Sequence, residues 1–155
     1  MGMDVIGKNP TKPEGKYFGS NVWYWHPLWD YCETIAPEIT SRVRNAHFND
    51  GDGLEAAEAL RLGERLTEEI ESGRALEAVE KFNAERNSIP NERCDICDGT
   101  GKRAEPPAIG PGNMPCNACG GKGERRPISA WYGMHIEHVK KFAEFLKHCG
   151  GFEIW

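Results

Sequence analysis

The stretch that decides the fold of the middle of this chain is "CDICDGTGK", residues 94–102, and a close copy, "CNACGGKGE", follows at residues 116–124. Each copy spells Cys-x-x-Cys-x-Gly-x-Gly. A cysteine pair with this spacing can direct both sulfurs at one metal ion, and a structural zinc ion takes four ligands in a tetrahedron. The two copies together therefore predict one four-cysteine site, with one structural Zn²⁺ held by Cys94, Cys97, Cys116 and Cys119.

The distance between the two pairs agrees with this prediction. The 18 residues from Asp98 to Pro115 separate them, within the range usual for zinc sites built from two Cys-x-x-Cys pairs. The glycines of each copy allow the tight positive-φ turns that aim backbone N–H groups at the thiolates. Two alternatives remain, a redox-active pair and an iron–sulfur cluster. A redox pair is disfavoured because neither copy is followed by helix-forming sequence.

The paired motif resembles the cysteine-rich zinc region of DnaJ-type co-chaperones, over residues 94–123. That family carries four copies and two zinc sites, whereas this chain carries two copies, enough for one site. It lacks the His-Pro-Asp signature of the J domain, so the resemblance implies a zinc ribbon and no co-chaperone activity. The whole chain also resembles, more weakly, small uncharacterised phage and bacterial proteins, through "MGMDVIGKNP" at one end and "FAEFLKHCGGFEIW" at the other.

The segments around the motif are mainly helical in pattern. We expect helices over 26–36, 37–46, 52–72, 74–86 and 131–148, with apolar stripes such as Ala59, Leu62, Leu66 and Ile70 on the third and Leu76, Val79 and Phe82 on the fourth. The third and fourth should form an antiparallel pair around the turn at Ser72-Gly73. The closing "FEIW" reads as a strand that pairs with the opening "MDVIG". The prediction is an α+β, predominantly helical domain (residues 1–91 and 127–155) with a short terminal sheet and one inserted zinc ribbon (92–126).

Residues 17–32, "YFGSNVWYWHPLWDYC", concentrate aromatic side chains. They are interpreted first as core, because a small protein can anchor its interior on large aromatic groups. The alternative is an aromatic wall for a flat, nucleotide-like ligand, made of Trp23, Trp25, His26, Trp29 and Asp30. No catalytic residues are predicted, since His26 and Asp30 have no evident nucleophile.

Two further motifs have plainer explanations. "NDGDG", residues 49–53, fails the EF-hand pattern because its twelfth position is Ala59, so Asp50 or Asp52 is expected to cap the following helix. His135 and His138 lie one turn apart, and no third ligand is near in sequence; we expect ordinary helix-surface histidines.

Composition limits the functions to consider. The 155 residues carry a net charge of -5, with 39% hydrophobic and 28% charged residues, which disfavours a general polyanion binder. There is no apolar run long enough to cross a membrane and no secretion-signal pattern, so a cytoplasmic protein is expected, in the host cytoplasm if the gene is a phage's.

The expected function is a zinc-stabilised binding protein that acts on a host macromolecule, with binding favoured over catalysis. A protein partner is favoured, and nucleic acid could bind through Arg93, Lys102, Arg103, Lys122, Arg125 and Arg126 of the ribbon. An acidic surface over residues 50–85, with 11 acidic and 4 basic side chains, could meet a basic partner. The alternative function is a small-molecule binder or enzyme that uses the aromatic segment.

Overall fold

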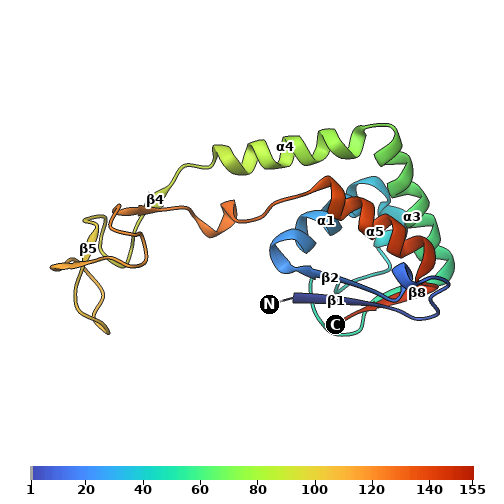
Figure 1. The fold of residues 1–155 in the computed structure, drawn as a ribbon, viewed down its shortest axis with the longest axis horizontal. Coiled ribbons are helices and arrows are strands. Elements are labelled where there is room, and N and C mark those ends of the chain that lie inside the picture. Colours follow the sequence, from blue (N-terminus) through green and yellow to red (C-terminus); the bar gives the residue numbers. More distant parts are fainter. Residues whose placement is uncertain (1) are drawn as a thin grey trace. The chain divides into compact units, whose positions relative to one another are not determined.

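The computed structural model describes residues 2–155. Its contacts divide the chain into two compact units: Met1–Ala84 with Tyr132–Trp155, and Glu85–Trp131. The chain builds most of the first unit, forms the second, and returns to complete the first (Figure 1). The predicted ribbon lies within the second unit.

A four-stranded antiparallel sheet forms one layer of the first unit, in the order β2-β1-β8-β3 (Figure 1). The strands are β1 (Gly2–Gly7), β2 (Tyr17–Asn21), β3 (Gly53–Glu55) and β8 (Gly151–Ile154). The predicted pairing of the two terminal segments is confirmed, with Val5 opposite Ile154. β2 and β3 were not anticipated from the sequence.

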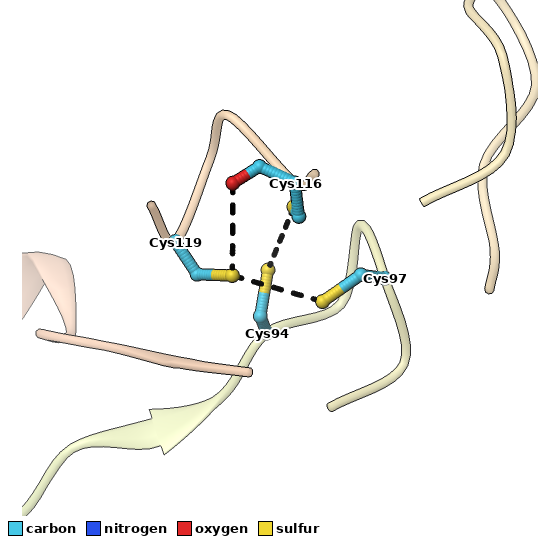
Figure 2. Close-up of side chains that lie close together, drawn as sticks. All are labelled: Cys94, Cys97, Cys116 and Cys119. Atoms are coloured by element: carbon cyan, nitrogen blue, oxygen red, sulfur yellow. Dashed lines mark hydrogen bonds between the residues drawn. The ribbon is translucent and has the colours of Figure 1, made fainter. Parts of the chain in front are cut away.

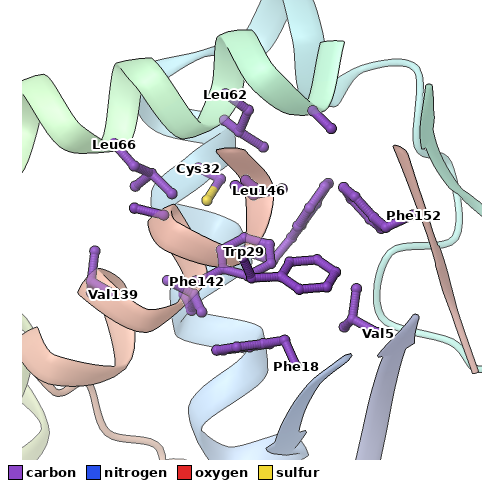
Figure 3. Close-up of a cluster of buried hydrophobic side chains, with 14 of the residues drawn as sticks. Val5, Phe18, Trp29, Cys32, Leu62, Leu66, Val139, Phe142, Leu146 and Phe152 are labelled. Atoms are coloured by element: carbon purple, nitrogen blue, oxygen red, sulfur yellow. The ribbon is translucent and has the colours of Figure 1, made fainter. Parts of the chain in front are cut away.

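Helices form the second layer. They are α1 (Val22–Ile35), the single turn α2 (Pro37–Thr40), α3 (Ala56–Glu71), α4 (Arg74–Ser88) and α5 (Ile136–His148). Helix α3 packs mainly against α5, and their apolar stripes meet side chains of the sheet in one core (Figure 3). The predicted α+β class, predominantly helical with a small terminal sheet, is confirmed.

Helix α1 begins earlier than predicted, at Val22 instead of His26, because the Asn21 side chain accepts hydrogen bonds from the backbone N–H groups of Trp23 and Tyr24. Pro27 therefore lies inside the helix and cannot bond the carbonyl of Trp23 four residues earlier. The N–H of Gly133 donates to that carbonyl instead, at 3.1 Å. A distant segment thus satisfies the acceptor that the proline leaves open.

The second predicted helix, 37–46, is wrong beyond its first turn. The backbone N–H groups of Arg44 and Asn45 donate to the Asp52 carboxylate at 2.7 and 2.9 Å, which fixes this segment as turns. The predicted cap of α3 by Asp50 or Asp52 is also wrong. Glu55 precedes the helix without a side-chain cap, because residues 53–55 are taken into the sheet as β3.

The turn at Ser72-Gly73 is confirmed, with Gly73 at a φ of 82°. The expected antiparallel pairing is not found, because α3 packs on α5 and α4 diverges from it at the turn (Figure 1). Of the inner stripe expected on α4, Val79 is buried and Phe82 packs partly buried against the core, whereas Leu76 is 45% exposed and Ala75 is buried in its place.

Helix α5 begins at Ile136, not at Trp131. The Asn83 side chain accepts from the N–H of Met134 and donates to its carbonyl, and these two bonds hold the residues before α5 out of the helix. The predicted end at Gly150-Gly151 is confirmed, with both glycines at positive φ. No helix of residues 2–155 combines the length and the apolar character that a membrane span needs.

The second unit consists of short strands, turns, a 3-10 helix (Ile128–Ala130) and the end of α4. Its strands are β4 (Glu92–Arg93), β5 (Lys102–Arg103), β6 (Met114–Pro115) and β7 (Glu124–Arg125). β4 pairs with β7 and β5 with β6, both antiparallel. Its buried cluster consists of the four cysteines, with Ile96 partly buried against them.

Candidate metal centre

The four predicted cysteines converge in the second unit. Their sulfur atoms all lie within 4.8 Å of one another, and all four residues are buried (Figure 2). Two contacts join the two copies of the motif, with Cys94 Sγ 3.9 Å from Cys116 Sγ and Cys97 Sγ 3.8 Å from Cys119 Sγ. The residues that the sequence singled out can therefore hold one metal ion.

The spacing of the sulfurs fits a tetrahedral centre. Four thiolates about 2.3 Å from a central zinc ion would lie about 3.8 Å from one another. The sulfur separations of 3.9 and 3.8 Å match this edge length. A disulfide, in contrast, needs sulfurs about 2.05 Å apart, and all six cysteines are free thiols.

Each Cys-x-x-Cys pair is held by the same local turn. In the first copy, the N–H of Gly99 donates to the carbonyl of Cys94 at 3.0 Å; in the second, Gly121 donates to Cys116 at 3.0 Å. The N–H of Gly123 also donates to Cys119 Sγ at 3.2 Å. Backbone N–H groups directed at sulfur stabilise thiolates, so the local fold prepares these residues for a cation.

The two copies also interlock. The N–H of Cys94 donates to the carbonyl of Gly123, and the N–H of Cys116 donates to that of Gly101, both at 2.9 Å. A Cβ added to Gly101 would lie 2.3 Å from the Gly121 carbonyl oxygen, and one added to Gly123 would lie 2.3 Å from that of Gly99. The last glycine of each copy is therefore required twice, for its positive φ and for close contact with the other copy.

Two arginine side chains also connect one copy of the motif to the other. Arg103 follows the first copy and donates from Nη1 to Asn117 Oδ1 in the second, at 2.8 Å. Arg125 follows the second copy and forms an ion pair from Nη2 to Asp95 Oδ1 in the first, at 3.2 Å. The motif predicted the metal ligands, but it gave no sign of these crossed contacts.

Surroundings already favour the charged form of one ligand. Burial alone would raise the pKa of Cys119, but hydrogen bonds with the Gly123 N–H and the three neighbouring thiols outweigh this effect and lower the pKa to about 7. A thiolate is the form that binds a metal.

The five residues of the predicted aromatic wall do not form one surface, because two of them are buried in the core. Trp25 and Trp29 are fully buried, and their rings stack on each other with centroids 5.6 Å apart. Both indole N–H groups are used internally, by the Ala46 carbonyl and the Glu33 carboxylate. Neither ring therefore offers a face to a ligand in this structure.

The other three wall residues lie nearer the surface. The Trp23 ring meets Tyr132 edge-on, and the Asp30 carboxylate lies 3.2 Å from His47 Nε2. His26 lies between His47 and Tyr132, with ring centroids 4.4 and 5.8 Å away. Burial and then His47 lower the pKa of His26, while Asp30 opposes the shift. His47 and Tyr132 are far from His26 in sequence, so no local pattern could have indicated this cluster.

The helix histidines do not form a metal site with other side chains of residues 2–155. His138 Nε2 is hydrogen-bonded to Ser20 Oγ at 2.9 Å, and its ring packs on Phe18. His135 is exposed and contacts the Tyr24 ring. His135 thus precedes α5, whereas His138 lies half-buried on it.

Comparison with protein-family models, with curated proteins and with solved structures gives no match to this chain. The resemblance to the DnaJ-type zinc region therefore rests on the paired motif and on the convergence of its cysteines.

Proposed function

We propose that the cysteine centre binds one zinc ion and that this protein is a zinc-stabilised binding protein whose ribbon docks on a partner protein. The observation that carries the proposal is the closed set of four thiols at tetrahedral spacing. Catalytic zinc sites keep one position for water or substrate, whereas four protein ligands leave none. This set of four ligands therefore favours a structural ion. The function would then lie in the surface of the ribbon that the ion stabilises.

The ribbon offers an apolar surface of its own. The residues between the two copies carry Ile109 and Met114, whose exposed fractions are 70% and 46%. Because the centre of the unit is filled by sulfur, these side chains have no core to enter. Exposed large apolar side chains are typical of protein interfaces, where Met is enriched.

The loop that carries Ile109 is held in one conformation. The N–H of Gly110 donates to the carbonyl of Ile96 and the N–H of Ala104 donates to that of Gly110, at 3.0 and 2.8 Å. Arg103 adds a hydrogen bond from its guanidinium to the carbonyl of Ala108. A surface that is ordered before binding loses less conformational entropy on docking.

The arginines of the ribbon favour a protein partner over nucleic acid. Arg93 pairs with Asp98 at 2.8 Å, Arg125 pairs with Asp95 and Glu92, and Arg126 donates to the carbonyl of Ala130. These groups are already engaged within the second unit. Four thiolates around one dication would also add about two negative charges, which weakens the attraction for phosphates.

The test is a pull-down with the immobilised zinc-loaded chain, followed by identification of the captured proteins by mass spectrometry. The phage or bacterial origin suggested by the chain ends makes a bacterial lysate the source to use. The test variant is Ile109→Asp combined with Met114→Asp. Leu76→Asp is the control, because Leu76 is 45% exposed on α4, outside the ribbon.

A partner captured by the wild type and by Leu76→Asp, and lost with the double variant, would support the proposal. Equal capture by all three proteins would refute the ribbon as the binding surface. Zinc is tested separately by elemental analysis, where one zinc per chain is expected. Iron in its place, with the visible absorption of an iron–sulfur cluster, would contradict the structural zinc.

A further inference from the structure

Strand β2 forms one edge of the sheet, and the register of the strands shows which backbone groups face outward. Asp4 lies opposite Gly19 on β2, yet it exchanges both of its backbone hydrogen bonds with Trp155 on its other side, at 2.7 and 2.8 Å. Hydrogen bonding alternates along an antiparallel pair. Gly19, and Tyr17 two residues before it, therefore direct their N–H and C=O groups away from β1, towards the open edge.

A cavity of about 370 Å³ lies beside this edge, between β2 and α5. Phe18 and Phe145 supply its apolar side chains, with ring centroids 6.0 Å apart. Tyr17 and Gly19 line it on the strand side, and Lys141 lines it on the helix side. The outward backbone groups of β2 and the apolar cavity thus belong to one groove.

The groove has two different ends. His138 lies at one end, bonded to Ser20 at 2.9 Å. Glu14 and Glu144 line the other end, where the C-terminus of α5 meets the segment before β2 through a hydrogen bond from the Thr11 N–H to the His148 carbonyl, at 2.9 Å. Glu144 is already paired with Lys147 at 2.8 Å and with His148 at 3.0 Å, so the exposed Glu14 is the carboxylate of this end that can pair with a ligand.

We propose that β2 accepts an extended peptide segment of a partner protein as an additional strand of the sheet. The backbone of that segment would bond Tyr17 and Gly19, because donors and acceptors that repeat every second residue are what a β-strand offers. One large apolar side chain of the peptide enters the cavity over Phe18 and Phe145. A Lys or Arg two positions away, on the same face of the peptide, reaches Glu14.

This groove lies wholly in the first unit, so the inference is independent of the ribbon and of the metal. The probe is a phage-displayed library of random octapeptides, selected on the immobilised full-length, zinc-loaded protein. Enriched sequences are synthesised with a fluorescent label, and their affinity is measured by polarisation. We expect enrichment of a large apolar residue with a basic residue two positions away.

Backbone N-methylation of the enriched peptide tests the strand geometry. Methyl groups on alternate residues that face β2 should weaken binding about tenfold or more, whereas methyl groups on the intervening residues should have little effect. Equal effects of the two sets would overturn the proposal, because they would show recognition through side chains alone.

Two variants of the protein complete the test. Gly19→Pro removes an outward N–H and no bond of the sheet, and the nearest atoms to a Cβ added there belong to the exposed side chain of Tyr17. It should weaken peptide binding about tenfold with an unchanged circular dichroism spectrum.

Glu14→Lys should weaken binding of the selected peptide about fivefold. The same variant should bind more tightly a peptide whose basic residue is replaced by Glu. Glu77→Lys on α4 is the matched control and should bind as the wild type does.

Failure to enrich any peptide, or peptides that bind Gly19→Pro as tightly as the wild type, would overturn the proposal. Concentration-dependent dimerisation that Gly19→Pro abolishes would also overturn it, because the edge would then be occupied by a second copy of this chain.

Discussion

The two units of this chain are stabilised by different means. The first buries a continuous cluster of large apolar side chains, among them Trp25, Trp29 and Phe142, none of which is exposed. The second buries four cysteines with Ile96 partly buried beside them. One unit can fold by removing apolar surface from water, whereas the other lacks that surface and, on our proposal, would be stabilised by a zinc ion between its four cysteines. The two units should therefore unfold independently.

The largest expected effect is loss of the metal. Cys94→Ala should unfold residues 92–126, because binding of a structural zinc supplies about 10–16 kcal/mol of folding free energy in small zinc domains. The helices of the first unit should remain, so most of the far-ultraviolet circular dichroism should be kept while bound zinc is lost.

Cys149→Ala is the control for this variant. Cys149 is buried in the first unit, away from the metal centre, so its removal should leave one zinc per chain. Loss of the helical signal in Cys94→Ala would contradict the independence of the two units.

The converse variant is Trp29→Ala. Replacing a fully buried tryptophan with alanine should destabilise the first unit by about 3–5 kcal/mol. Cobalt substituted at the metal centre should keep its thiolate absorption through the denaturant range in which the helical signal disappears. Simultaneous loss of both signals would show that the units unfold as one.

A third variant separates backbone conformation from packing inside the ribbon. Gly101→Ala places a methyl group 2.3 Å from the Gly121 carbonyl oxygen at a φ of 75°, so we expect a loss of about 3 kcal/mol in ribbon stability and weaker metal binding. Gly120→Ala is the control, because its φ is 58° and no atom lies within 4 Å of the added group.

Gly120→Ala should lower the stability of the ribbon by about 1 kcal/mol, the penalty of the left-handed backbone conformation alone. Asp98, at the equivalent position of the first copy, already carries a side chain at a φ of 54°. Competition with a chromophoric chelator measures both affinities. Equal affinities for the two variants would refute the interlocking of the two copies.

The same contrast explains which parts of the structure could be predicted from sequence. The metal centre depends on local turns, so the spacing within each Cys-x-x-Cys pair was sufficient to identify all four converging residues. The paired terminal strands followed from apolar segments with clear breaks. Element boundaries in the first unit instead depend on bonds between distant residues, such as Gly133 to the Trp23 carbonyl and Arg44 to Asp52. No local pattern contains these contacts.

The edge strand β2 is a further example. Residues 17–21 were interpreted as part of an aromatic segment, because only the register with β1 reveals the alternation of buried Phe18 with exposed Tyr17 and Gly19. The groove beside β2 depends in addition on α5, from the other end of the chain. It could not have been found before the fold was known.

The smallest predicted effect concerns buried negative charge, which the two units neutralise in different ways. In the ribbon the proposed zinc ion would neutralise the four thiolates, whereas in the first unit Glu69, only 4% exposed, is neutralised by Arg74. The Arg74 guanidinium donates to both Glu69 oxygens, at 3.0 and 2.8 Å, and Tyr31 donates at 3.1 Å. Glu69→Gln should therefore destabilise the first unit by about 2 kcal/mol at neutral pH, since hydrogen bonds to a charged group are lost.

The pH dependence of this effect has a definite sign. The bonds from Arg74, followed by that from Tyr31, hold the pKa of Glu69 below its ordinary value despite burial. The stabilisation is then fully present above the unfolded pKa of about 4.3 and is lost as the pH falls through the lower, folded pKa. Urea unfolding should show a difference between wild type and Glu69→Gln that is constant above about pH 5 and shrinks below it. Glu68→Gln, whose side chain is 63% exposed, should differ little from wild type at any pH. If the difference in unfolding free energy between wild type and Glu69→Gln persisted unchanged at pH 3, Glu69 would stabilise the first unit through its packing and not through its charge.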